Sequence, residues 1–211
     1  CTCWLTPMPQ RIIDAFADVL PGDQLAAALA ADNTPPSTHL VVRPGLSQVA
    51  ELGGEPLRWS PFGARAAGNP SVLAAVRDGR AGVQDEGSQL VAWALARADA
   101  PAGPWLDSCA GPGGKAALLA GLARQAGDSL VASELQPHRA ALVAKALAGY
   151  PEPRPLVVAA DATRPAWPTG VFARVMLDAP CTGLGALRRR PEARWRRRPA
   201  DLDALVPLQR T

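Results

Sequence analysis

Histidine, cysteine and long apolar runs are scarce in this sequence of 211 residues, and each scarcity excludes a class of protein. Two histidines and four scattered cysteines do not provide the usual ligand set of a zinc site, so no metal is predicted. The cysteines are also too few and too scattered for a disulfide framework, and Cys1 and Cys3 have no predicted role. No stretch approaches the roughly 18 uninterrupted apolar residues of a membrane span, and no signal peptide is visible. The sequence therefore predicts a soluble, cytoplasmic protein without a membrane partner.

Lysine is scarce as well, and the basic charge is concentrated in one place. The net charge is +3, but seven arginines and one acid between Arg188 and Arg198 carry +6, which leaves −3 for the other 200 residues. Dense arginine with an interleaved aromatic is typical of phosphate binding and base stacking. The alternative is a solvated, arginine-rich helix start. We predict an RNA-binding segment that comprises Arg188, Arg189, Arg190, Arg194 and Trp195.

Short apolar runs alternate with helical patterns in the second half of the chain. We expect strands over residues 104–107, 129–132, 156–159 and 174–177, helices over 87–98, 115–124 and 136–149, and a loop over 162–173. This alternation predicts an α/β fold with a parallel sheet.

The first part of the chain has a different pattern of predicted elements. Two short helices are expected within residues 10–31 and a strand over 39–43, followed over residues 44–82 by a stretch rich in glycine and proline with short helical or strand pieces. We therefore predict a small α+β accessory region over residues 1–82 and a parallel-sheet domain over residues 83–211.

An acidic residue follows or ends each of the four expected parallel strands. These acids are Asp107, Glu134, Asp161 and Asp178. One acid at such a position is commonly a helix cap, whereas four in register indicate a ligand site, because open α/β sheets bind ligands outside the carboxyl ends of their strands.

A glycine-rich loop follows the first of these strands and opens a helix. The segment Leu106–Lys115 is not a phosphate-binding P-loop, because Cys109 and Ala116 stand where that motif needs glycine and a hydroxyl residue. A dinucleotide fingerprint fits superficially, with Glu134 about 20 residues further on. The other readings are the nucleoside-binding loop of an S-adenosylmethionine methyltransferase and a tight strand-to-helix turn.

Three motifs together resemble one family. Residues 83–89 (VQDEGSQ), the loop 107–115 and residues 177–185 (LDAPCTGLG), followed by the arginine-rich segment, closely resemble the RsmB/NOL1/NOP2/Sun family of RNA cytosine-5 methyltransferases. The bacterial ribosomal RNA small-subunit methyltransferase B branch is the nearest. The resemblance covers roughly residues 38–210. It implies a Rossmann-like S-adenosylmethionine-dependent methyltransferase sheet, and it implies methylation of cytosine C5 in RNA, most naturally ribosomal RNA.

The resemblance also implies roles for individual residues. Glu134 stands where the family usually has aspartate for the ribose of S-adenosylmethionine, Asp161 resembles the acid beside the adenine, and Arg139 fits a supporting position. Asp178 resembles the acid near the methionine end of the cofactor and the target base. The cofactor loop comprises Cys109, Ala110, Gly111, Pro112, Gly113, Gly114 and Lys115.

The chemistry of such enzymes requires a cysteine thiolate, which adds to C6 of the cytosine. Cys181 follows Pro180, as the nucleophile does in DNA cytosine-5 methyltransferases. In the RNA family a later cysteine attacks and the Pro-Cys cysteine assists release of the product, so the resemblance makes Cys181 auxiliary. We expect Asp178 and Cys181 to be catalytic, Cys109 to be a small buried residue, and the chain to stop before the last strands and the nucleophile.

Two other functions remain open at this stage. A catalytically silent RNA-binding module is expected if no further cysteine follows Thr211 in the parent gene. A nicotinamide-dependent oxidoreductase would use the same glycine loop, but it leaves residues 178–181 and the arginine-rich segment unexplained. Residues 1–82 resemble the accessory region that precedes the catalytic domain in the family, so we expect part of an RNA-binding face there.

Overall fold

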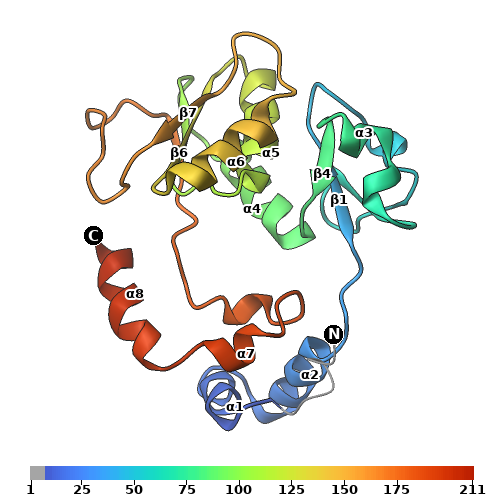
Figure 1. Cartoon of the computed structure of the whole chain (residues 1–211), viewed down its shortest axis with the longest axis vertical. Helices are drawn as coiled ribbons and strands as arrows, with labels where there is room; N and C mark the ends of the chain where they lie inside the picture. The colour runs from blue at the N-terminus through green and yellow to red at the C-terminus, as the bar shows by residue number, and fades with distance from the viewer. Residues whose placement is uncertain (1–7) are drawn as a thin grey trace. The chain divides into compact units, whose positions relative to one another are not determined.

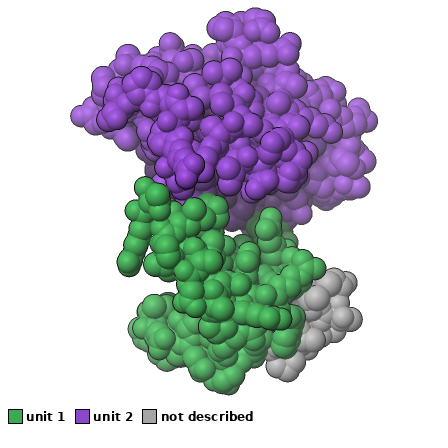
Figure 2. Space-filling model, turned by 60° about the vertical axis from the view of Figure 1, so that its left-hand side comes forward, with its two compact units in different colours: residues 1–37, 180–211 green, residues 38–179 purple. Residues whose placement is uncertain are grey.

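The computed structural model describes residues 8–211, and the chain divides into two compact units (Figure 1, Figure 2). Unit 2 is continuous and spans residues 38–179. Among the described residues, unit 1 combines residues 8–37 with residues 180–211. The predicted boundary at residue 82 does not coincide with the boundary between the two units. It lies inside unit 2, between two different sheets, and it divides the strand that ends at Val83 before its last residue. It stays a prediction about functional organisation.

The larger sheet of unit 2 is parallel, as predicted. Its spatial order is β7-β6-β5-β8, and every neighbouring pair is parallel. Strand β5 at its centre is buried at all three positions. The four strands are β5 (Trp105–Asp107), β6 (Leu130–Glu134), β7 (Leu156–Ala159) and β8 (Arg174–Met176).

Three helices pack with this sheet. Helix α4 contacts α5 and β8, while α5 and α6 contact each other and β6. The eight residues from Ala116 to Ala123 of α5 are all buried, and most are small, so the helix can approach its neighbours closely. Residues 162–173, where a loop was predicted, form no helix or strand. The helices are α4 (Glu86–Arg97), α5 (Gly114–Gln125) and α6 (Pro137–Leu147).

A second, antiparallel sheet precedes the parallel one. Its order is β2-β3-β1-β4, and its small core includes Leu40, Leu52 and Ala64. The sequence predicted the strand at β1 and, without bounds, short helical or strand pieces after it, and the structure defines the elements between residues 49 and 83. The elements of this part are β1 (His39–Val42), η2 (Val49–Leu52), β2 (Glu55–Pro56), β3 (Gly63–Arg65), η3 (Pro70–Val72), α3 (Ala74–Arg77) and β4 (Ala81–Val83).

Unit 1 is helical. The two short helices predicted near the N-terminus are confirmed as α1 (Gln10–Ala17) and α2 (Gly22–Asp32). The C-terminal part of the unit contributes η4 (Leu184–Ala186), α7 (Ala193–Arg196) and α8 (Ala200–Arg210). Ile12, Leu187 and Arg194 are buried in this unit.

Candidate active site at the carboxyl edge of the parallel sheet

The strand order of the parallel sheet reverses at β5. From β5 the chain proceeds outward through β6 to β7, and it then returns to place β8 on the other side of β5. In open α/β sheets, ligands bind at such a switch point, outside the carboxyl ends of the strands. Asp107 and Glu134 end β5 and β6, and Asp161 and Asp178 each follow the next strands by two residues. All four predicted acids therefore belong to one edge of one sheet.

The glycine loop crosses this edge between β5 and α5. Its Ala110 amide donates to the Ser133 carbonyl of β6 at 2.8 Å, which fixes the loop on the neighbouring strand. Gly113 has φ +109°, and a Cβ there would lie 2.6 Å from the Ala146 Cβ of α6. Glycine is therefore required at residue 113 both by the backbone conformation and by the packing of the loop against α6.

Glu134 is bonded to the loop. Its Oε2 atom accepts the Gly111 amide at 3.0 Å, its Oε1 atom accepts the Gln136 amide at 3.0 Å, and its side chain is nearly buried. Arg139 of α6 donates to the Gly111 carbonyl at 2.7 Å and lies 3.7 Å from Glu134 Oε2. The acid predicted to meet a ribose, the supporting arginine and the loop thus form one hydrogen-bonded group.

Asp107 is the most deeply buried of the four strand-end acids. Its side chain is 1% exposed, and neither carboxylate oxygen has a hydrogen-bond partner within residues 8–211. The pKa of Asp107 is raised to about 7, chiefly by burial and to a smaller extent by the charges of Asp178 and Glu134, while the nearby Cys109 amide and Lys115 act in the opposite direction. The sequence placed Asp107 in the series of strand-end acids but gave it no role of its own.

An ion pair joins the two sides of the switch point. Lys115 lies in the first turn of α5, and its Nζ atom is 2.7 Å from Oδ2 of Asp178, which follows β8. The lysine side chain is largely covered, whereas Asp178 is 58% exposed. The last residue of the predicted cofactor loop and the predicted catalytic acid are therefore in direct contact.

Asp161 is organised locally. Its Oδ1 atom accepts the backbone amide of Thr163 at 2.9 Å and the hydroxyl of Thr163 at 2.8 Å. These hydrogen bonds hold the pKa of Asp161 below its usual value. The carboxylate therefore stays charged at neutral pH and is fixed where the chain leaves β7.

The cysteines differ in their surroundings. Cys109 is half-buried in the loop, and its pKa is raised by burial and by the carboxylates of Asp107, Glu134 and Asp178. A raised pKa keeps this thiol protonated, which supports the prediction that Cys109 is not a nucleophile. Cys181 is exposed and belongs to unit 1, three residues after Asp178. Cys1 and Cys3 lie outside the described residues.

The arginine-rich segment in unit 1 is not uniformly exposed. Arg188, Arg189, Arg190 and Trp195 are exposed, as an RNA-binding surface requires. Arg194 differs from its prediction, because its side chain is fully buried and its guanidinium donates to the Asn33 side chain and the Asp32 carbonyl. A side chain in this position is not available to a phosphate. The sequence could not separate Arg194 from the arginines around it.

Residues 8–211 contain no group of three or more His, Cys, Asp or Glu side chains placed to hold a metal ion. No helix within the same residues is long and apolar enough to cross a membrane.

Comparisons with known proteins address the identity of this site. Residues 92–211 match the family model of the 16S rRNA methyltransferase RsmB/F. A provisionally named methyltransferase of Mycobacterium tuberculosis, Rv1407, is 52% identical to this chain. The matched region covers 96% of this chain and 45% of Rv1407. Ribosomal RNA small subunit methyltransferase B of Pasteurella multocida is 37% identical over 66% of the chain and 32% of its own length. The chain thus spans half or less of the length of these relatives.

Solved structures share the fold. The crystal structure of PH0851 superposes on this chain with a TM-score of 0.81 at 24% identity. The superposition covers 99% of this chain and 49% of PH0851. NSun6 from Pyrococcus horikoshii with SFG gives a TM-score of 0.73 at 16% identity, over 96% of this chain and 77% of that one. At these identities the likeness supports the Rossmann-like fold. The family match covers more than half of the chain, and it establishes that this chain belongs to the RsmB/F family of 16S rRNA methyltransferases, within the RsmB/NOL1/NOP2/Sun group.

Proposed function

We propose that this chain is part of an enzyme that uses S-adenosylmethionine to methylate C5 of a cytosine in RNA, with ribosomal RNA as the substrate. The observation that carries the proposal is the meeting of the glycine loop, Glu134 and the Lys115–Asp178 pair at the switch point of the sheet. The names of the relatives support RNA as the substrate, and the NSun6 structure with SFG, an analogue of S-adenosylmethionine, supports the cofactor. A nicotinamide-dependent oxidoreductase does not agree with the family.

The residues at this edge fit the proposed cofactor. When bound, S-adenosylmethionine supplies an electrophilic methyl group. Its amino-acid end carries one positive and one negative charge, and Lys115 with Asp178 offers one charge of each sign. The amides at the start of the 12-residue helix α5 favour a carboxylate. Asp107 adds a buried carboxyl group without a partner among the described residues.

The roles proposed for the other cofactor residues follow from their positions. Glu134 hydrogen-bonds the ribose hydroxyls, and Arg139 holds Glu134 and the loop in place through its contacts with both. Asp161 borders the adenine. In the loop, Gly111 and Gly113 keep the backbone close to Glu134 and α6, and the remaining members Cys109, Ala110, Pro112 and Gly114 complete the turn.

The proposed chemistry at the base uses Asp178 and two cysteines. A thiolate adds to C6 of the cytosine, which makes C5 nucleophilic. C5 would then take the methyl group as the neutral thioether of the cofactor leaves, and loss of the C5 proton would allow the C6–S bond to break and release the thiolate. Asp178 hydrogen-bonds the N3 edge of the base and favours the addition. Cys181, exposed three residues further on, assists release of the product, and a cysteine later in the whole protein is the attacking residue.

The proposal is tested with the full-length protein and its own small-subunit ribosomal RNA. Incubation with isotopically labelled S-adenosylmethionine, followed by mass spectrometry of the nucleosides, should detect labelled 5-methylcytidine. Methylation at another base or atom would reject the proposed specificity. RNA binding without methyl transfer would instead favour the silent RNA-binding module.

A further inference from the structure

One arginine of the arginine-rich segment ties that segment to the N-terminal helices. Arg194 of α7 donates to Oδ1 of Asn33 at 2.7 Å and to the carbonyl of Asp32 at 2.5 Å. Asp32 is the last residue of α2, and Asn33 caps it. The final carbonyls of a helix lack partners within the helix, and a positive charge there is favoured by the helix dipole. Arg194 therefore closes the C-terminus of α2 from a position 161 residues later in the chain.

Two other arginines reinforce the contact. Arg11 of α1 donates to the backbone carbonyls of Arg194 and Arg197. Arg188 donates to the carbonyl of Thr34 at 3.4 Å. We call Arg11, Arg188 and Arg194 the arginine clasp. These hydrogen bonds lie within unit 1, and each joins the N-terminal segment to residues 188–197.

The clasp lies in a partly apolar setting. Leu187 and Arg194 are fully buried, and Ile12 is 3% exposed. Burial raises the pKa of Asp32, and the charges of Arg194 and Arg188 oppose that rise. A guanidinium buried in this way is stable only while its partners stay in place, because removing one leaves a desolvated charge.

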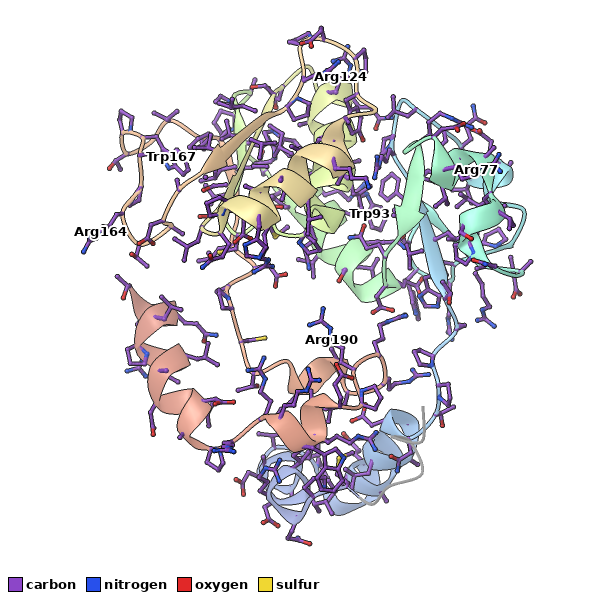
Figure 3. The ribbon with its side chains drawn as sticks, in the orientation of Figure 1. Arg77, Trp93, Arg124, Arg164, Trp167 and Arg190 are labelled. Carbon is purple, nitrogen blue, oxygen red and sulfur yellow. The ribbon has the colours of Figure 1, made fainter. Side chains whose placement is uncertain are left out.

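The residue next to Arg194 has the opposite environment. Trp195 is 53% exposed although Arg194 is fully buried, since neighbouring residues of a helical turn face different directions. Arg190, labelled in Figure 3, and Arg196 are exposed too. The clasp thus holds Arg194 inward while Arg190, Trp195 and Arg196 of the same segment are exposed.

We propose that Arg194 is a positioning residue that orders residues 187–198 against α1 and α2 and thereby presents Arg190, Trp195 and Arg196 to single-stranded RNA. Arg194 itself makes no RNA contact. The part of this proposal that concerns RNA rests on the proposed function, whereas the ordering role concerns unit 1 alone. The N-terminal helices consequently contribute to RNA affinity without supplying the charges that bind it.

The ordering role is tested by hydrogen exchange on the full-length protein. Asn33→Ala removes the side-chain acceptor without changing the charge of the arginine-rich segment, and Arg194→Gln removes the donor. Both variants should lose amide protection over residues 187–198 and α2, and the double variant should lose little more than either alone. Arg196→Gln is the matched control, and its protection should equal that of the parent. Unchanged protection in Asn33→Ala would overturn the clasp.

The RNA role is tested by the salt dependence of binding. Arg190→Gln removes a phosphate contact, so the slope of log Kd against log salt concentration should fall by about 1. Asn33→Ala should weaken RNA binding at fixed salt although it removes no charge. If Arg194→Gln keeps its protection and lowers the slope as Arg190→Gln does, Arg194 contacts phosphate and the proposal is wrong. If the parent protein binds no RNA, the proposed function fails, while hydrogen exchange still decides the ordering role.

Discussion

The backbone amide of Gly111 and the carboxylate of Glu134 are hydrogen-bonded at 3.0 Å, and the approach is so close that a Cβ at Gly111 would overlap Oε2 of Glu134. The same Cβ would lie 3.0 Å from Nε of Arg139. The position of the loop thus depends on the absence of a side chain at residue 111. The acid at the end of β6 is held by the loop that it is proposed to assist.

Gly111→Ala should therefore displace either the loop or the Glu134 carboxylate. We expect the affinity for S-adenosylmethionine to fall by at least about tenfold, because the loss of one charged hydrogen bond corresponds to about 1.5–3 kcal/mol. Isothermal titration calorimetry on the full-length protein measures the change. Gly68→Ala is the matched control, since a Cβ there meets nothing within 4 Å. Equal affinities in the two variants would contradict the proposed role of the loop.

The raised pKa of Asp107 predicts how stability depends on pH. Its pKa is about 7 in the folded protein against 3.8 ordinarily, so the unfolded chain releases this proton first as pH rises. The stability associated with the protonated group is complete below about pH 4 and is lost as pH rises through about 7. Asp107→Asn cannot ionise and should lose less stability over this range. The difference between pH 5 and pH 8 is expected to be about 2–3 kcal/mol in the free energy of unfolding.

Urea denaturation of the parent and of Asp107→Asn at the two pH values measures this difference. Asp161→Asn is the control, because the pKa of Asp161 is lowered in the folded protein. The stability contributed by Asp161 is present above its ordinary pKa and is lost only as pH falls through the lowered value, so Asp161→Asn should follow the parent profile between pH 5 and pH 8. A pH profile of Asp107→Asn that runs parallel to the parent profile would show that Asp107 is ionised throughout.

The parallel sheet could be predicted from the sequence because its strands are short apolar runs separated by clear helices and turns. Strand β7 was predicted at 156–159 and is found at Leu156–Ala159. The antiparallel sheet was largely missed, since β2, β3 and β4 have only two or three residues each and carry no readable period. Their existence depends on pairing with partners distant in the sequence, such as that of Leu40 with Ala64.

The sequence alone did not predict which charged side chains of the site are buried. The position of Asp107 at the end of an apolar run was visible, but its desolvation depends on the loop, α5 and the other acids that surround it. Arg194 is one of seven arginines between residues 188 and 198, and the sequence around it does not differ from that around the others. Only its tertiary contact with the C-terminus of α2 distinguishes it. The residue types and their order along the chain therefore predicted the class of chemistry, while packing decided which charges are available.

Cys181→Ser distinguishes the two roles that the Pro-Cys motif allows for Cys181, which are product release and nucleophilic attack. If Cys181 assists product release, the full-length variant should accumulate covalent protein–RNA adducts, which denaturing gel electrophoresis detects as a slow-migrating band. If Cys181 is the nucleophile, adducts should be absent. The control is Cys109→Ser added to Cys181→Ser, and adducts should persist in this double variant, because a half-buried thiol with a raised pKa should not form the bond. Loss of the adducts in the double variant would contradict the structural role of Cys109.

Asp178→Asn separates catalysis from stability at the Lys115 ion pair. The pair spans 2.7 Å, but Asp178 is 58% exposed, and an ion pair of this kind contributes at most about 1 kcal/mol to folding. We therefore expect a small change in the free energy of unfolding, together with a loss of methyl transfer of about 100-fold or more, because the carboxylate no longer assists the addition at the base. Single-turnover kinetics and urea denaturation measure the two quantities on the same preparation, with Asp203→Asn in the exposed part of α8 as the control. Retained transfer would remove Asp178 from the chemistry. A large loss of stability would instead assign the pair to holding β8 and α5 together, because the charge of Lys115 is then left without compensation in its covered position.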